Sequence, residues 1–121
     1  MKNIIVIELP IDTVSEANKR EHWTRKANRV KCQRSEAYYL CMLNEGIFYD
    51  DMKSNIKINL TRLAPRSLDS DNLCCALKAV RDGIADWLRI DDGSKRLKWD
   101  YDQKRISKTK SIRVEIAILN P

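Results

Sequence analysis

The chain of 121 residues carries a formal net charge of +6 at pH 7, and 43% of its residues are hydrophobic. This length and composition predict a single globular domain spanning residues 1–121 and argue against a disordered chain. No apolar run approaches the roughly 18 residues of a transmembrane helix, and the apolar start is too short for a secretory signal. We therefore expect a cytoplasmic protein without a membrane partner.

The first predicted strand covers residues 3–9, a compact β-branched run that is typical of a buried strand. A long helix is predicted over residues 19–44, where apolar residues recur at roughly helical spacing with basic residues between them. Gly46 is placed to end this helix. Residues 54–63 alternate between apolar and polar side chains, which predicts a half-buried strand.

The clearest predicted helix covers residues 72–88, which carry a continuous apolar stripe at helical spacing. Gly83 inside it costs roughly 1 kcal/mol relative to alanine, which indicates that another element packs closely there. Two alternating strands follow, over residues 97–103 and 112–118. The order β-α-β-α-β-β predicts an α+β domain with a mixed or antiparallel sheet and the helices packed on one face.

The four cysteines are predicted to be free thiols. They include no C-x-x-C pair, and the chain has a single histidine, His22, which argues against a structural zinc site. We expect the thiols to pack as small apolar groups in a reducing compartment. They are Cys32, Cys41, Cys74 and Cys75.

The positive charge favours an anionic partner, and its distribution indicates nucleic acid. Two basic blocks, residues 19–34 and 95–113, lie on either side of an acidic region. This pattern predicts phosphates held by the basic blocks over a metal bound by the acidic region. A well-solvated surface would tolerate the same charge and is the alternative interpretation.

Two pairs of carboxylates form the acidic region. Asp69 and Asp71 lie two residues apart just before the second predicted helix, and Asp91 with Asp92 follow it. If the pairs meet, they form an oxygen-rich site suited to Mg²⁺, with Mn²⁺ as the alternative ion, and such an ion activates water for phosphodiester hydrolysis. Alternatively, Asp71 caps the helix and Asp92 with Gly93 forms a turn, which leaves Asp69 without a role.

The stretch RSLDSDNLCCALKAVRDGIADWLRIDDG, residues 66–93, resembles the RusA-type Holliday-junction resolvases, especially their phage-borne branch. The shared pattern is Asp-x-Asp-Asn-Leu opening a helix, then Asp-Asp and a strand, and a weaker likeness covers most of the chain. The resemblance implies a homodimeric, Mg²⁺-dependent endonuclease from a bacterial cell or a prophage. Such an enzyme cuts four-way DNA junctions by paired incisions in recombination and repair, without a small-molecule cofactor.

Carried over residue by residue, the resemblance implies that three aspartates are the catalytic, metal-binding carboxylates. These are Asp69, Asp71 and Asp92, with Asp91 as a possible helper. Asn72 matches the asparagine of the family and is expected to orient the loop or cap the helix.

The family lysine is displaced in this chain. Four residues after the second aspartate, where the type member has its functional lysine, stands Cys75. Lys78 lies three residues further on. It either supplies the missing cation to catalysis or forms a solvated ion pair with Asp82, four residues along the helix.

Basic residues of the first predicted helix are expected to contact phosphates, which orients DNA without reading bases. The candidates are Lys19, Arg20, Lys26 and Arg29. His22 is interpreted as a phosphate contact or packing residue rather than a general base. Trp23 and Trp99 either stack on exposed bases or belong to the core.

Two other functions remain open from the sequence. The chain is then either a catalytically weak or inactive protein that binds branched DNA, or a basic nucleic-acid adaptor. In the adaptor, the aspartates serve only as helix caps and turn residues.

Overall fold

The computed structural model describes residues 3–13, 22–48, 54–106 and 110–119. Its elements follow the predicted order, which confirms the α+β class. None of the helices within these ranges is long and apolar enough to cross a membrane. The elements are β1 (Asn3–Leu9), α1 (Trp23–Glu45), β2 (Asn55–Ala64), α2 (Ser70–Leu88), β3 (Leu97–Arg105) and β4 (Ser111–Leu119).

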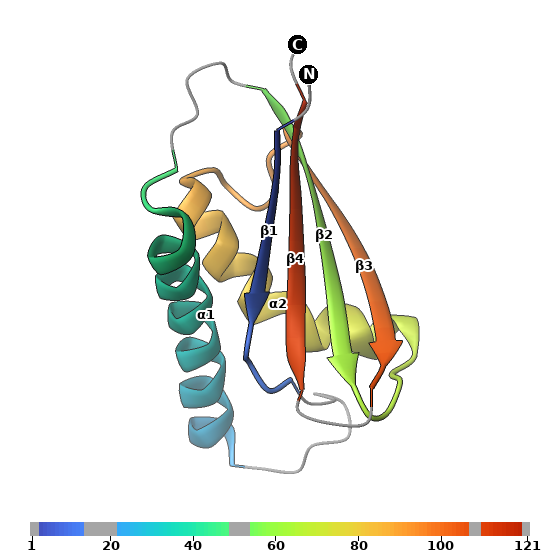
Figure 1. Ribbon diagram of the computed structural model, residues 1–121. Coiled ribbons are helices and arrows are strands. Elements are labelled where there is room, and N and C mark those ends of the chain that lie inside the picture. The colour runs from blue at the N-terminus through green and yellow to red at the C-terminus, as the bar shows by residue number, and fades with distance from the viewer. Residues whose placement is uncertain (1–2, 14–21, 49–53, 107–109, 120–121) are drawn as a thin grey trace.

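The strands form one mixed sheet in the order β1-β4-β2-β3. β4 pairs antiparallel with both β1 and β2, whereas β2 and β3 run parallel. A parallel pair needs a crossover connection, and α2 makes the one between β2 and β3. Both helices lie on the same side of the sheet, as predicted (Figure 1).

The core lies between the sheet and α2. Ile56, Ile58 and Leu60 of β2 are at most 1% exposed, which confirms the predicted alternation along this strand. The apolar stripe predicted for the second helix is also buried, and Leu77 at its centre has no exposed surface. The stripe consists of Leu73, Leu77, Val80, Ile84 and Leu88.

β1 is only half buried, although its apolar run predicted a buried strand. Ile7 and Leu9 face the core and are 2% and 0% exposed. Ile4 and Val6 point to the opposite face of the sheet and are 65% and 58% exposed. The reason is that no described element covers that face, so alternate residues of β1 meet solvent whatever their polarity.

α1 begins at Trp23, and His22 serves as its N-cap by accepting a hydrogen bond from the Thr24 N–H through Nδ1. The helix ends at Gly46, whose φ of 73° suits a residue without a side chain, as predicted. The predicted first turn, residues 19–21, lies outside the described residues. Trp23 is 73% exposed, so it does not belong to the core.

Gly83 marks the point where the two helices touch. A Cβ built on this residue would lie 2.3 Å from the backbone oxygen of Arg34 and 2.8 Å from Cβ of Ala37, both in α1. Only glycine allows the helix backbones to approach this closely. The close packing expected at Gly83 is therefore present.

All four cysteines are free thiols, as predicted. The prediction that they pack as small apolar groups is correct only for Cys41, which is buried in the core. The other three lie on outward faces of the helices, where side chains meet solvent. They are Cys32, Cys74 and Cys75.

Candidate functional site

The first carboxylate pair lies at the N-terminus of α2. Asp69 is the N-cap, and its side chain accepts a hydrogen bond of 3.0 Å from the backbone N–H of Asn72. Asp71 lies in the first turn and is exposed. The helix starts at Ser70, two residues earlier than predicted, so the expectation that Asp71 caps it and Asp69 is left over was wrong. Asp71 is the acid that capping does not use.

Gln103 of β3 holds the loop before this cap in place. Its side-chain oxygen accepts a hydrogen bond of 2.8 Å from the Leu68 N–H, and its nitrogen donates one of 2.5 Å to the Leu68 carbonyl oxygen. The alternation over residues 97–103 predicted a strand that ends at Gln103, but it indicated no role for this residue. A buried amide needs hydrogen-bond partners, and Gln103 follows two aromatic residues on the inward side of the strand. This pattern is the sign in the sequence that Gln103 has a partner in the fold.

Buried Arg62 steadies the same loop from β2. It donates hydrogen bonds to the hydroxyl oxygen of Thr13 at 2.9 Å and to the carbonyl oxygen of Arg66 at 2.7 Å. The side chain is only 4% exposed, and burial lowers the pKa of its guanidinium. The loop that leads into α2 is therefore anchored to both neighbouring strands.

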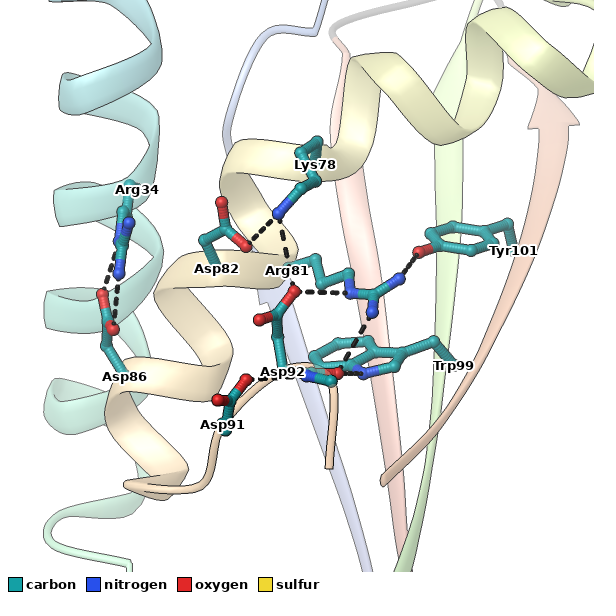
Figure 2. Close-up of polar contacts among 10 residues, drawn as sticks. Arg34, Lys78, Arg81, Asp82, Asp86, Asp91, Asp92, Trp99 and Tyr101 are labelled. Carbon is teal, nitrogen blue, oxygen red and sulfur yellow. Dashed lines mark hydrogen bonds and ion pairs between the residues drawn. The ribbon is translucent and has the colours of Figure 1, made fainter. Parts of the chain in front are cut away.

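The second carboxylate pair lies in the loop between α2 and β3, which is tied down at Asp92 (Figure 2). The backbone oxygen of Asp92 accepts hydrogen bonds from Trp99 Nε1 at 3.0 Å and from Arg81 at 3.1 Å. Arg81 also donates to the Tyr101 hydroxyl at 2.7 Å, and its guanidinium carbon lies 4.9 Å from the centre of the Trp99 ring. This network fixes the direction in which the Asp92 side chain leaves the backbone.

The carboxylate of Asp92 faces two cations on α2. One of its oxygens lies 3.5 Å from Lys78 Nζ and 3.5 Å from Arg81 Nε. Lys78 makes a shorter contact, 2.6 Å, with Asp82. Partial burial acts to raise the pKa of the Asp92 carboxyl, but Lys78 and Arg81 outweigh it and hold that pKa below its ordinary value. Asp92 is therefore ionised and loosely paired at neutral pH.

Lys78 contacts two carboxylates, those of Asp82 and Asp92. It forms the ion pair expected with Asp82, and its hydrogen bond to that carboxylate raises the pKa of its ammonium group. It also reaches Asp92, fourteen residues further along the chain. Cys75, at the position of the family lysine, is exposed one turn nearer the start of the helix.

Asp91 has a different partner, the backbone of Gly93. One of its carboxylate oxygens accepts a hydrogen bond of 2.9 Å from the Gly93 N–H, so Asp91 closes the turn that was predicted for Asp92. Asp91 and Asp92 border a hollow of about 430 Å³. Arg34, on the facing helix, also borders the hollow and pairs with Asp86 at 2.7 Å.

The two carboxylate pairs lie along one strand but apart. Trp99 and Gln103, which hold their loops, are four residues apart on β3, which corresponds to about 13 Å. Asp71 and Lys78 are seven residues apart, on the same face of α2 and separated by about 10 Å along its axis. Among the described residues, no three or more His, Cys, Asp or Glu side chains are grouped so that they could hold a metal ion. The three aspartates therefore do not surround one Mg²⁺ ion in this arrangement.

The expected DNA contacts are only partly described. Lys26 is exposed on the first turns of α1, and Arg29 is half-buried there. Lys19 and Arg20 lie outside the described residues. Trp99 is half-buried and engaged with the loop of Asp92, whereas Trp23 is largely exposed.

A basic hollow adjoins the loop that carries Asp92, and the sequence analysis did not single it out. It measures about 310 Å³ and lies where β2 and β3 begin. Lys57 and Lys98 are directly opposite each other in the parallel pair of strands, although Asp100 lies 3.5 Å from Lys57. Like charges in this position destabilise a sheet, and the carboxylate of Asp100 offsets part of that repulsion. The basic residues that line this hollow are Lys57, Lys95, Arg96 and Lys98.

Comparison with known proteins does not identify a family. No protein-family model matches the chain, and no curated protein matches it. The structure of the FtsZ W319Y mutant from M. jannaschii aligns over 98% of this chain and 27% of its own, with 12% identity and a TM-score of 0.45. TubZ from Bacillus thuringiensis serovar israelensis aligns over 99% and 26%, with 10% identity and a TM-score of 0.47.

A third solved structure gives a similarly slight likeness. Thiamine-monophosphate kinase from Stenotrophomonas maltophilia aligns over 98% of this chain and 32% of its own, with 12% identity and a TM-score of 0.38. The chain spans less than a third of each of these proteins. We draw no argument about function from these likenesses.

Proposed function

We propose that the chain is an endodeoxyribonuclease that cuts four-way DNA junctions as a homodimer with Mg²⁺. The observation that supports it best is the contact between Lys78 and Asp92. These residues are fourteen apart in the sequence. Asp92 was carried over from the resemblance to the RusA-type resolvases, and Lys78 was considered as a substitute for the lysine that Cys75 replaces. In this proposal Lys78 acts in place of the family lysine beside the third carboxylate, Asp92, on the helix face that begins with Asp71.

The surroundings of the Lys78–Asp92 contact suit a polyanion. In this proposal the DNA backbone binds at the basic hollow, which borders the loop of Asp92 through Lys95 and Arg96. Lys57 and Lys98 of the same hollow project from the sheet face opposite to α2. Such contacts supply affinity and orientation rather than base recognition. Selectivity then comes from the shape of the junction, and a two-fold dimer presents two matched sites to it.

The metal is part of this proposal through the resemblance alone. Because the three aspartates do not form one group, we assign no reaction step to Mg²⁺. When bound, it would supply a charge that activates water and stabilises the leaving oxygen. Asp71 is the most available ligand, because it is exposed and no described hydrogen bond engages its carboxylate.

The separation of the carboxylates favours a second candidate function. A protein whose Asp92 is paired with Lys78 and Arg81 would bind branched DNA without cutting it. This candidate shares the basic hollow with the first and differs only in hydrolysis. The basic adaptor is the third, and it predicts no preference for a junction over a linear duplex.

The test is cleavage of a fluorescent synthetic four-way junction, with binding measured in parallel. We expect paired incisions that need Mg²⁺ and that disappear in Asp71→Asn and Asp92→Asn while binding is kept. Asp102→Asn, at an exposed position of β3, is the matched control and should cut normally. Tight junction binding without cutting at any Mg²⁺ or Mn²⁺ concentration would contradict the nuclease proposal and favour the protein that only binds branched DNA.

The salt dependence of the affinity for DNA distinguishes these candidate functions from a protein that does not bind nucleic acid. Affinity for the junction should fall steeply with salt, because each neutralised phosphate releases counterions. The double variant Lys57→Glu, Lys98→Glu should bind more weakly and show a smaller slope. A flat salt response of the unmodified protein would contradict every nucleic-acid function proposed here.

A further inference from the structure

β1 is one of the two edges of the sheet, and it is the unprotected one. Within the described part of the chain, β1 pairs with β4 alone. An edge strand presents backbone N–H and C=O groups that pair readily with another strand, so soluble proteins guard such edges with charges, proline or bulges. Between Asn3 and Leu9 the only charged residue is Glu8, and there is no proline.

The opposite edge differs from β1 in this respect. All four outward positions of β3 are charged, two positive and two negative, which discourages pairing with another chain. They are Lys98, Asp100, Asp102 and Lys104. The sheet is therefore protected at β3 and left open at β1, where Ile4 and Val6 are 65% and 58% exposed.

The helix beside β1 extends this apolar surface onto the other face of the sheet. A hollow of about 710 Å³ joins Pro10, which follows β1, to Cys32, Tyr39 and Leu40 of α1. Tyr39 is 64% exposed and Leu43, one turn further on, is 81% exposed. Figure 1 shows α1 running alongside β1, so a strand added at this edge would be flanked by apolar side chains on both faces.

We propose that the occupant of this edge is β1 of a second copy, paired antiparallel across a two-fold axis at Val6. In this register Val6 lies opposite Val6 and Ile5 opposite Ile7, so that apolar residues meet each other at the centre. An isologous contact of this kind forms a closed dimer, because the open edges of both copies are then paired. The strand is self-complementary because its single charge lies away from the axis.

This inference assigns an interface to the homodimer of the proposed function. It rests on that function only for the role that the dimer would have. The sheet becomes continuous through both copies, which holds the two Asp92 loops in a fixed relation. The experiments below use no DNA and no metal. The proposal of a dimer and the proposal of a nuclease can therefore be contradicted independently.

The first test is the oligomeric state of the full chain, measured by light scattering over a concentration series. We expect a dimer for the unmodified protein. Val6→Lys places two ammonium groups opposite each other at the axis, and it should raise the dissociation constant of the dimer at least about tenfold. Asp100→Lys, on the protected edge, is the control and should remain a dimer. Circular dichroism checks that both variants are folded.

The second test reads the register directly. Residues opposite each other in an antiparallel pair have Cα atoms about 4.5–5.5 Å apart, a range that suits a disulfide. With Cys32, Cys74 and Cys75 replaced by serine, Val6→Cys should cross-link into a dimer under mild oxidation, whereas Asp100→Cys should not. A monomeric unmodified protein, a Val6→Lys variant that dimerises normally, or cross-linking through residue 100 alone would each overturn the proposal.

Discussion

The side-chain amide of Gln103 forms two hydrogen bonds with the backbone of Leu68, one to its N–H and one to its carbonyl oxygen. Leu68 directly precedes the N-cap Asp69, so this pair of bonds fixes where α2 starts relative to β3. The candidate carboxylates at the start of α2 are therefore positioned by a residue that carries no charge.

Replacing Gln103 with leucine should destabilise the protein and weaken junction cleavage. The change leaves two part-buried backbone groups without partners, and each costs about 1–3 kcal/mol in the free energy of unfolding. Urea unfolding measures this loss. Lys104→Leu, an exposed change on the same strand, should leave stability nearly unchanged. Equal stability of the two variants would show that the amide pair does not position the loop.

Capping and function can be separated at the start of α2. Asp69→Ala removes the N-cap and should lower the free energy of unfolding by about 1 kcal/mol, whereas Asp69→Asn keeps a capping oxygen and should cost little. Asp71→Asn, with no capping bond to lose, should be close to the unmodified protein in urea unfolding. If Asp71→Asn instead cost more stability than Asp69→Ala, the assignment of the cap would be contradicted.

Gly83→Ala should destabilise the protein, although the same change in an ordinary helix interior stabilises it by about 1 kcal/mol. The added Cβ would lie 2.3 Å from the Arg34 carbonyl oxygen, so the helices must separate, at an overpacking cost of about 1–3 kcal/mol. Thermal unfolding measures the sign. Cys75→Ala, at an exposed position of the same helix, is the control and should be neutral or slightly stabilising.

Three of the four thiols should react readily with alkylating reagents, and Cys41 should not, because it alone is buried. Burial raises the pKa of the Cys41 thiol to about 12, and the thiolate is the reactive form. At pH 8, iodoacetamide should modify the other cysteines of the native protein and leave Cys41 unmodified until urea is added. Mass spectrometry of digested peptides measures each site, and rapid labelling of Cys41 in the native protein would mean that the core opens there.

Stability should depend on pH through the pair of Arg34 and Asp86. The hydrogen bonds from Arg34 lower the pKa of the Asp86 carboxyl in the folded protein, so the pair stabilises the fold above the ordinary carboxyl pKa and this contribution is lost as pH falls through the lowered value. Both side chains are substantially exposed, so Asp86→Asn should cost at most about 1 kcal/mol at pH 7.

Urea unfolding of Asp86→Asn and the unmodified protein at pH 7 and pH 3 checks this dependence. The difference between them should shrink at pH 3, and it should also shrink at high salt because the pair is accessible to ions. An unchanged difference at both pH values would indicate that the asparagine acts through something other than the lost charge.

The fold was predictable because its elements are strongly patterned. The stripe from Leu73 to Leu88 and the alternation around Ile58 each match one period of side-chain direction, and burial follows that period. The strand at residues 3–9 was predicted correctly, but its full burial was not, because a mostly apolar run does not reveal that one face of the sheet lacks a cover. That fact depends on where both helices pack, which lies outside the strand itself.

The candidate site was predictable only in part. Local chemistry identified Asp69, Asp71 and Asp92, but the helix start was misplaced by two residues, and this exchanged the roles of Asp69 and Asp71. The contact between Lys78 and Asp92 depends on how the chain returns after α2, and no local pattern encodes that return. Gln103 was passed over because its partner is the backbone of Leu68, which no residue type identifies, so its inward strand position was the only sign in the sequence.

The parallel pairing of β2 and β3 places both carboxylate loops at the two ends of a single crossover, within residues 65–97. The loop from Arg89 to Arg96 joins α2 to β3 without belonging to either, so evolution can lengthen or shorten it while the sheet and core stay as they are. Each inserted residue would move Asp92 relative to Asp71. The length of this one loop therefore sets the distance between Asp71 and Asp92 independently of the sheet.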